Sequence, residues 1–485
     1  MINRIAERIR SALLYVAGNV SLFVFTAFLV TGILCMEPMV WYREQINLIN
    51  QYVVFPWGMA LCLLRLERKR NVPQVSVRKD LAMLFVLLLW IVVPFALRFG
   101  VTFNNMGAWH NHAVAYFGIY GFLSEQEEQS RERAFDLFLL LCGVLSIVLG
   151  TLLLYCAVTA STIYHGAQNI GFGLADGAYI CHGVHYNLTG MTAVCLAMLS
   201  LAGAARSKRW PLRMLFSVSA ALMLVVIVLT QSRTARYSAI IALGIGTYGV
   251  IAGRVRMKSR VLHQATAIAA AAAVLVVSYV GAARLTDAAL AHYAEIEHAR
   301  AQGEEIGFIG QTMDVLAAPA LAEEEIAQKE LDALDARKAV DATFSDRTTI
   351  WKNLFAIWKE NPRHFLIGNG IGRTGSRVVA GTIHEKAGAV AMHNTYLQHT
   401  ADFGLIGTLL LAAFFVVLIK PLLGVFFAKG ERRKPGYTAL CMLVIACLAT
   451  GMMESAPLGA MSPMNMMLIF ALALLAGRGR DLALL

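Results

Sequence analysis

Long runs of apolar residues, separated by short polar segments, recur along most of the chain. Runs of about 17–25 apolar residues are long enough to cross the hydrocarbon core of a bilayer as helices. Because a helix satisfies its own backbone hydrogen bonds in lipid, this pattern predicts an all-α polytopic membrane protein with about twelve transmembrane helices. The twelve stretches are 13–36, 47–64, 81–97, 107–123, 135–158, 186–205, 212–230, 237–253, 263–282, 402–419, 437–453 and 463–476.

The composition agrees with this interpretation. Of the 485 residues, 58% are hydrophobic and only 15% are charged. That is too little polar surface to cover a soluble globule of this size. The first apolar stretch has no small-residue cleavage site, which favours an uncleaved signal anchor.

The positions of Lys and Arg predict the orientation, because cytoplasmic loops retain positive charge. With the N-terminus inside, the cytoplasmic segments carry 26 of the 42 Lys and Arg, and the short outer loops carry four. Both termini are then cytoplasmic, in a multi-pass protein of the bacterial inner membrane. The net charge of +11 is explained by this distribution and by attraction to anionic membrane lipids, so we expect no nucleic-acid partner.

One long polar region interrupts the pattern. It divides the chain into predicted transmembrane helices 1–9 (residues 1–282), a large periplasmic loop (283–401), and helices 10–12 with a cytoplasmic tail (402–485). Residues 287–341 of the loop are acidic and rich in Ala, which predicts solvated helices that serve as scaffold or insert.

Apolar residues at helical spacing follow in the segment SDRTTIWKNLFAIWKENP. We expect a helix that is capped by Ser345 or Asp346, ends before Pro362 and lies flat on the membrane surface. Its tryptophans, Trp351 and Trp358, favour packing over contact with a substrate.

Arginines gather on the outer side of the predicted bundle. Arg233 and Arg236 lie between spans seven and eight, Arg347 opens the interfacial helix, and Arg373 and Arg377 follow it. Activated glycosyl donors outside the cytoplasm are lipid diphosphates, and guanidinium groups bind diphosphate oxygens without a divalent ion. The short outer loops hold no DxD-like acidic pair, so we expect catalysis that needs neither a metal nor another cofactor.

A candidate base stands at the end of the loop, in MHNTYLQHTADFGLIG. His393 precedes a predicted helix, whose N-terminus disfavours the imidazolium and leaves a neutral ring that can accept a proton. A hydrogen-bonded structural histidine is the alternative. His399 lies too far along the helix to face the same way.

Three motifs together resemble the O-antigen ligase and polymerase family of bacterial membrane glycosyltransferases. The segment around His393 looks like the family signature HNxxLxxxxxxGxxG, with Asp402 in place of the usual Glu. TQSRTARYSAI resembles the SR-containing helix start, and DRTTIWKNLFAIWKENPRHFLIGNGIG resembles the segment with the RxxxW, NP and GxG elements. The order is that of the family, and the resemblance covers residues 186–407, including Asn187 in HYNLTGM.

The resemblance implies an inverting glycosyltransferase that completes lipopolysaccharide. It would move O-antigen from undecaprenyl diphosphate to a sugar hydroxyl of lipid A-core at the periplasmic face. Arg233 and Arg347, helped by Arg236, would hold the diphosphate, and His393 would activate the acceptor. The supporting residues would be Asn394, Asp402 and Asn187. The alternatives are an O-antigen polymerase, a protein O-oligosaccharyltransferase and, as a non-enzyme, a polysaccharide exporter or flippase.

Overall fold

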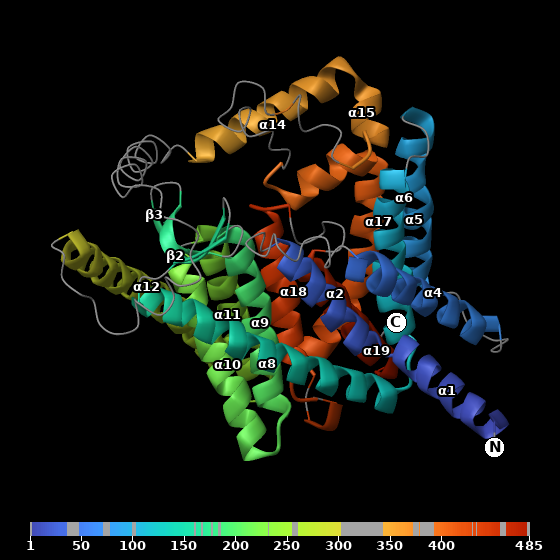
Figure 1. Cartoon of the computed structure of the whole chain (residues 1–485), viewed down its shortest axis with the longest axis horizontal. Coiled ribbons are helices and arrows are strands. Elements are labelled where there is room, and N and C mark those ends of the chain that lie inside the picture. Colours follow the sequence, from blue (N-terminus) through green and yellow to red (C-terminus); the bar gives the residue numbers. More distant parts are fainter. Residues whose placement is uncertain are drawn as a thin grey trace. The chain divides into compact units, whose positions relative to one another are not determined.

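The computed structural model of the chain is dominated by helices (Figure 1). The structure describes residues 2–35, 48–70, 78–98, 103–159, 162–165, 168–175, 178–182, 186–230, 232–254, 260–301, 343–371, 378, 392–428, 430–432, 434–455 and 462–482. Its helices are α1 (Ile2–Ala17), α2 (Val20–Cys35), α4 (Phe55–Arg70), α5 (Lys79–Arg98), α6 (Phe103–Ala113), α7 (Phe122–Ser124), α8 (Glu128–Thr159), α9 (Tyr186–Arg206), α10 (Trp210–Leu229), α11 (Arg233–Arg254), α12 (Arg260–Ala301), α14 (Thr343–Glu360), α15 (Pro362–Ile367), α17 (Thr395–Phe426), α18 (Tyr437–Gly451) and α19 (Pro463–Asp481).

Each of the twelve apolar stretches overlaps a helical segment. By length and composition, five segments of the described chain qualify to cross a membrane, and a sixth span results if the bent pair α1 and α2 counts as one. The five segments are Glu128–Ala157, Asn187–Arg206, Trp210–Leu229, Gln264–Leu285 and Thr395–Phe426. A helical polytopic architecture therefore fits the structure, and the number of twelve spans remains a prediction.

The first apolar stretch differs from the single helix that its sequence predicts. The structure divides it into α1 and α2, which are bent by 59° at Gly18 and Asn19. The Asn19 side chain accepts a hydrogen bond from the backbone of Leu22 at 3.0 Å. A new helix therefore starts after the bend, because an Asn side chain at this position satisfies an otherwise unpaired N–H group.

The helices form two compact units with separate cores. The first unit comprises residues 1–31, 48–139 and 345–485, and the second comprises residues 32–47 and 140–344. The three-part division made from the sequence remains a prediction about membrane topology.

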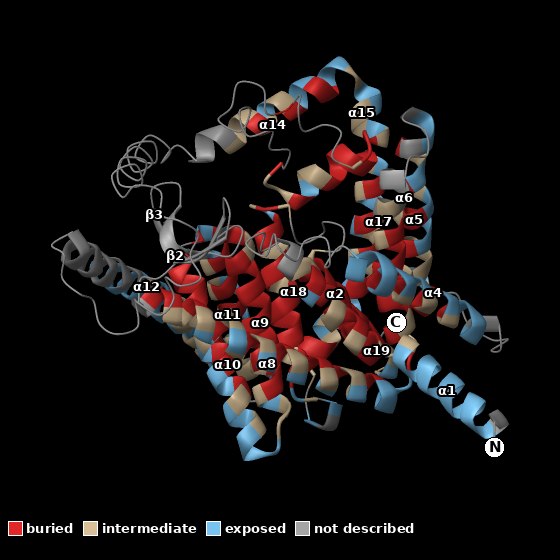
Figure 2. Ribbon diagram, in the orientation of Figure 1, coloured by how far each residue is buried: buried red, intermediate tan, exposed pale blue. Residues whose placement is uncertain are grey.

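In the first unit, α19 is the most enclosed helix. Its residues from Pro463 to Gly479 are buried, as the red ribbon in Figure 2 shows. It packs against α17 and α18, and α17 also packs against α5 and α15. The buried Arg131 of α8 forms an ion pair with Asp481 at the end of α19. Burying a cation with a carboxylate partner avoids the desolvation penalty of an unpaired charge.

In the second unit, small residues bring the helices close together. Helix α9 packs against α10 and α11, and α11 packs against α12. At Gly203 of α9, an added Cβ would lie 2.5 Å from the ring of Phe216, and at Gly143 of α8 it would lie 2.8 Å from the same ring. Small residues at helix contacts are typical of membrane proteins, in which close backbone approach supplies the packing.

A small sheet departs from the all-α expectation. Strands β1 (Thr162–His165), β2 (Gln168–Ala175) and β3 (Ala178–His182) form an antiparallel meander in the order β1, β2, β3. Thr162 pairs with Gly171, and Gly171 pairs with His182. The sheet lies between the predicted spans 135–158 and 186–205.

The large loop is described only in part. Helix α12 continues to Ala301, well beyond the predicted end of its apolar stretch, and so contains the start of the acidic region. Most of that region lies outside the described residues, as do Arg373 and Arg377.

Candidate active site

The carboxylate of Glu454 joins two of the predicted functional residues in the first unit. One oxygen accepts a hydrogen bond from the Arg347 guanidinium at 2.9 Å, and the other lies 3.2 Å from His393 Nδ1. The three side chains are mostly enclosed, with exposed fractions of 16%, 17% and 8% for Arg347, His393 and Glu454. An imidazole, a guanidinium and a carboxylate therefore lie in contact at one mostly enclosed position.

The contact with Glu454 decides how His393 can act. A carboxylate accepts hydrogen bonds, so in a neutral His393 ring this contact favours the tautomer with the proton on Nδ1 and an unprotonated Nε2. An oriented imidazole with an unprotonated Nε2 is the form that takes a proton in general-base catalysis. The role of His393 as a base remains a prediction.

The backbone at His393 is strained. Its φ of 47° is left-handed, and it is the only residue other than glycine with a positive φ among those described. This conformation costs about 1–3 kcal/mol and persists only where the surroundings fix it. Both neighbours are fixed: Met392 donates its N–H to Gln398 and accepts a hydrogen bond from the Trp351 indole, while Asn394 donates to Met452.

Asn394 also begins helix α17. Its side-chain oxygen accepts hydrogen bonds from the backbone of Tyr396 and Leu397, both at 3.0 Å. Asn is a preferred residue at this position because its side chain pairs with N–H groups that the first helical turn leaves open. His393 is therefore the residue immediately before the cap of α17.

Asp402 is linked to the residues around His393 through Gln398. Its carboxylate accepts a hydrogen bond from the Gln398 amide at 3.0 Å, and the same amide accepts the N–H of Met392. Asp402 is buried, so the hydrogen bond compensates for the loss of water. The contacts therefore link Asp402 through Gln398 to Met392, the residue before His393.

Helix α14 carries Arg347 and packs its apolar stripe on the protein itself. The stripe residues Ile350, Leu354, Ile357 and Trp358 are buried with Val378, Met392 and Ala401, and Trp351 packs at the edge of the same cluster. The stripe therefore packs within the protein, which is the role favoured for the tryptophans over contact with a substrate. The flat position of this helix on the membrane surface remains a prediction.

The ends of α14 are close to the predicted ones. The helix begins at Thr343, two residues before the expected cap, and ends at Glu360. Asn361 then caps α15, and Pro362 occupies the first helical turn. Proline is tolerated there because its missing N–H would have no partner in that turn.

Two glycines join α15 to α17. Gly368 has a φ of 85°, and Gly404, where α17 departs from helical geometry, has a φ of 73°. A Cβ at Gly404 would lie 2.3 Å from the Leu366 carbonyl oxygen, so the backbones cross in contact. Asn369 and Gly370 donate to the carbonyl groups of Ala401 and Asp402 at 2.9 and 2.8 Å. These contacts anchor the NP and GxG segment on the helix that follows His393.

The other two arginines that the resemblance assigns to the diphosphate, Arg233 and Arg236, lie in the second unit. Ser232 accepts the N–H of Ala235 at 3.2 Å at the start of α11, and its hydroxyl donates to the Asn187 side chain at 2.7 Å. Arg233 is exposed and Arg236 half-buried on the first turn of this helix. Anions are stabilised at a helix N-terminus, which carries partial positive charge.

The structure thus brings the predicted residues together in two groups, one in each unit. Arg347, His393, Asn394 and Asp402 lie in the first unit, and Asn187, Arg233 and Arg236 lie in the second. His399 is buried and faces Phe403 and Thr408, so it points elsewhere as expected.

Sequence reasoning missed Glu454 as a site residue. The signal available was a lone carboxylate at the end of an apolar stretch, since ionisable residues in such places are functional candidates.

Comparison with known families agrees with the motifs. Residues 218–412 match the model of a family described as O-antigen ligase. A search of curated proteins found no match. The matched segment includes the start of α11, helix α14, His393 and the glycine contact between α15 and α17. Over residues 218–412, the match therefore supports the resemblance of this chain to the O-antigen ligase and polymerase family.

Proposed function

We propose that this protein is an inverting, metal-independent glycosyltransferase. It transfers O-antigen polysaccharide from undecaprenyl diphosphate to a sugar hydroxyl of lipid A-core at the periplasmic face of the inner membrane. The observation that carries the proposal is the Glu454 carboxylate held between His393 and Arg347. This arrangement supplies the two groups that glycosyl transfer from a diphosphate requires, a base for the acceptor and a cation for the leaving group.

The reaction is a single displacement. His393 Nε2 takes the proton of the acceptor hydroxyl as its oxygen attacks the anomeric carbon. The bond between that carbon and the diphosphate oxygen breaks, and the lipid diphosphate leaves with the electron pair. Glu454 stabilises the imidazolium that forms, as the carboxylate does in a catalytic triad. Attack opposite the leaving group inverts the anomeric configuration.

Arginines bind the leaving diphosphate in this proposal. Arg347 is assigned to it by its place beside His393, and Arg233 and Arg236 are assigned by the family motif on α11. A guanidinium binds phosphate oxygens with two parallel hydrogen bonds and remains charged at any physiological pH. Such a donor stabilises the negative charge that develops in the transition state.

The remaining predicted residues hold this machinery in place. Asn394 caps α17 and fixes the residue after His393, Asp402 holds Gln398, and Asn187 accepts from the Ser232 hydroxyl at the start of α11. Each acts through another residue and is therefore a positioning residue.

To test the acceptor, the protein is expressed in a strain that lacks its own ligase but makes lipid-linked O-antigen. The lipopolysaccharide of that strain is then analysed on a gel. A ladder attached to lipid A-core is the expected result. Longer chains that remain on the lipid diphosphate would replace the ligase assignment with polymerase, and sugar found on protein would replace it with protein glycosylation. Export of unaltered glycan without any new glycosidic bond would contradict the enzymatic account.

A further inference from the structure

Helix α1 presents two opposite faces. Ile5, Ile9, Leu13 and Val16 follow one another at spacings of three and four, so they form a stripe along one side of the helix. Arg4 lies on the opposite side, and Arg8 and Arg10 lie at the two edges of the stripe. With a single glutamate, Glu7, the charged face has a net positive charge.

The apolar stripe of α1 has no cover in the described part of the chain. The exposed fractions of Ile5, Ile9, Leu13 and Val16 are 48%, 55%, 64% and 46%. In contrast, Phe23, Val24 and Ala27 of the next helix are completely buried. The described part of the chain therefore encloses part of α2 and does not cover the apolar side of α1.

The bend keeps α1 from continuing straight into α2. A helix of 16 residues is about 24 Å long, which is too short to cross the hydrocarbon core of a bilayer. The bend is fixed on both sides, because the Trp57 indole donates to the Ala17 carbonyl at 2.9 Å and Asn19 caps α2. The 59° angle is therefore part of the fold of the first unit.

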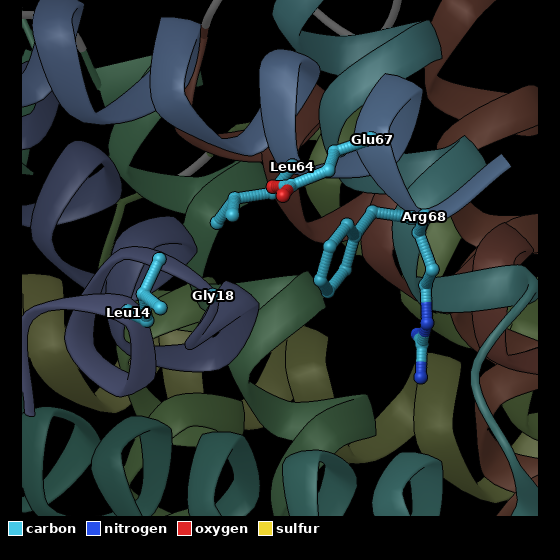
Figure 3. A pocket seen from close by; sticks show the side chains of 6 residues that line it. Leu14, Gly18, Leu64, Glu67 and Arg68 are labelled. Atoms are coloured by element: carbon cyan, nitrogen blue, oxygen red, sulfur yellow. The ribbon is translucent and has the colours of Figure 1, made fainter. Parts of the chain in front are cut away.

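A cavity beside the bend shows which way α1 is turned. It has a volume of about 300 Å³ and is lined by Leu14, Gly18, Leu64, Glu67, Arg68 and Phe122. Figure 3 shows Leu14 and Gly18 on one side of it and Leu64, Glu67 and Arg68 of α4 on the other. Leu14 lies on the opposite side of α1 from the centre of the stripe. The contact with α4 therefore turns the stripe away from the protein.

We propose that α1 lies in the membrane interface, with its apolar stripe in the acyl region and Arg4, Arg8 and Arg10 bound to anionic phospholipid headgroups. The balance of apolar and charged residues is that of helices that lie on membranes, which combine a charged face, an apolar face and low overall hydrophobicity. Arginines at the edges of a stripe reach headgroup phosphates while their methylene stems stay in the apolar layer. Arg68, on the wall of the cavity, adds a further cation at the same corner.

Photo-crosslinking in the full chain tests the position of the stripe. The protein is reconstituted in nanodiscs with p-benzoylphenylalanine in place of Ile9 or, as the matched control, in place of Ser11 on the polar face. Irradiation is expected to produce a phospholipid adduct at position 9 and little or none at position 11. A crosslink from position 9 to this chain or to a second copy would overturn the proposal, because the stripe would then be covered by protein.

Hydrogen exchange tests the role of charge. Amide exchange in α1 is expected to be slower in phosphatidylglycerol-rich nanodiscs than in phosphatidylcholine nanodiscs. The R4Q/R8Q/R10Q variant should lose this difference in exchange rate between the two lipids. Each arginine should contribute a factor on the order of fivefold to the difference. The control K208Q/R209Q/R213Q, which neutralises three exposed cations at the turn before α10 and in its first turn, should keep it. Equal exchange of wild-type α1 in both lipids would overturn the binding to anionic headgroups.

Discussion

His393 Nδ1 lies 3.2 Å from the carboxylate of Glu454, although 61 positions separate the two residues. Two hydrogen bonds between neighbouring residues hold this contact in place. The Asn394 side chain donates to the Met452 carbonyl at 2.9 Å, and the Thr395 hydroxyl donates to the Glu454 carbonyl at 2.6 Å. The start of α17 and the end of α18 are thus joined by three hydrogen bonds around the histidine. Contacts within the fold therefore set the orientation of the His393 ring.

The Glu454→Gln variant tests this orientation. Glutamine keeps the size of the side chain but removes the charge that fixes the proton on Nδ1 and stabilises the imidazolium. The transfer rate should fall by on the order of 10²–10⁴, with a small change in KM. The measurement is kcat with purified protein, beside Glu360→Gln, which removes an exposed carboxylate of α14. A kcat equal to that of this control would argue against an orienting role.

Arg347→Lys tests the assignment of the diphosphate cation. Lysine keeps the positive charge but cannot offer two parallel hydrogen bonds, so the rate should fall by on the order of 10²–10³. The matched control is Arg363→Lys on the exposed side of α15, which should leave the rate unchanged. Tm is measured for both variants, because Glu454 loses its guanidinium partner in the first one. Equal rates in the two variants would remove Arg347 from the donor site.

Chelation of divalent ions should leave the purified enzyme active. The proposal assigns the charge of the leaving diphosphate to arginines, which need no metal as an intermediary. The measurement is the transfer rate before and after treatment with EDTA, with Mg²⁺ added back. A rate that disappears with EDTA and returns with Mg²⁺ would contradict the assignment of diphosphate binding to arginine alone.

Gly404→Ala tests the crossing between α15 and α17. Alanine at a φ of 73° is strained, and its Cβ would lie 2.3 Å from the Leu366 carbonyl oxygen. The backbones must then separate, which should lower Tm by several degrees. Gly281→Ala in α12 is the control, since its added Cβ meets nothing within 4 Å and alanine favours the helix. An unchanged Tm in Gly404→Ala would show that the crossing contributes little to stability.

Much of the architecture follows from local sequence patterns. Apolar runs indicate the helices, Pro362 marks the end of α14, and the HN pair marks the start of α17. These features depend on neighbouring residues along the chain, so that a single sequence is enough to read them.

The features that the sequence did not predict depend on contacts between distant residues. Glu454 looks like an isolated carboxylate until α18 is placed beside the start of α17. Gly404 sits in a regular apolar pattern, and only the crossing backbone of α15 explains its left-handed conformation. The apolar stripe of α14 predicts an interfacial helix equally well as a packed one, because both need the same spacing. The bend at Gly18 is likewise fixed by Trp57, 40 positions away from Ala17.

The most direct test of the central claim is the transfer rate of the His393→Ala variant, measured in nanodiscs with lipid-linked O-antigen and lipid A-core. His364→Ala, at a half-buried histidine of α15, is the matched control. We expect His393→Ala to accumulate normally and to lose on the order of 10²–10⁴ in rate, while the control remains active. A near-normal rate in His393→Ala at equal protein levels would contradict the assignment of His393 as the base.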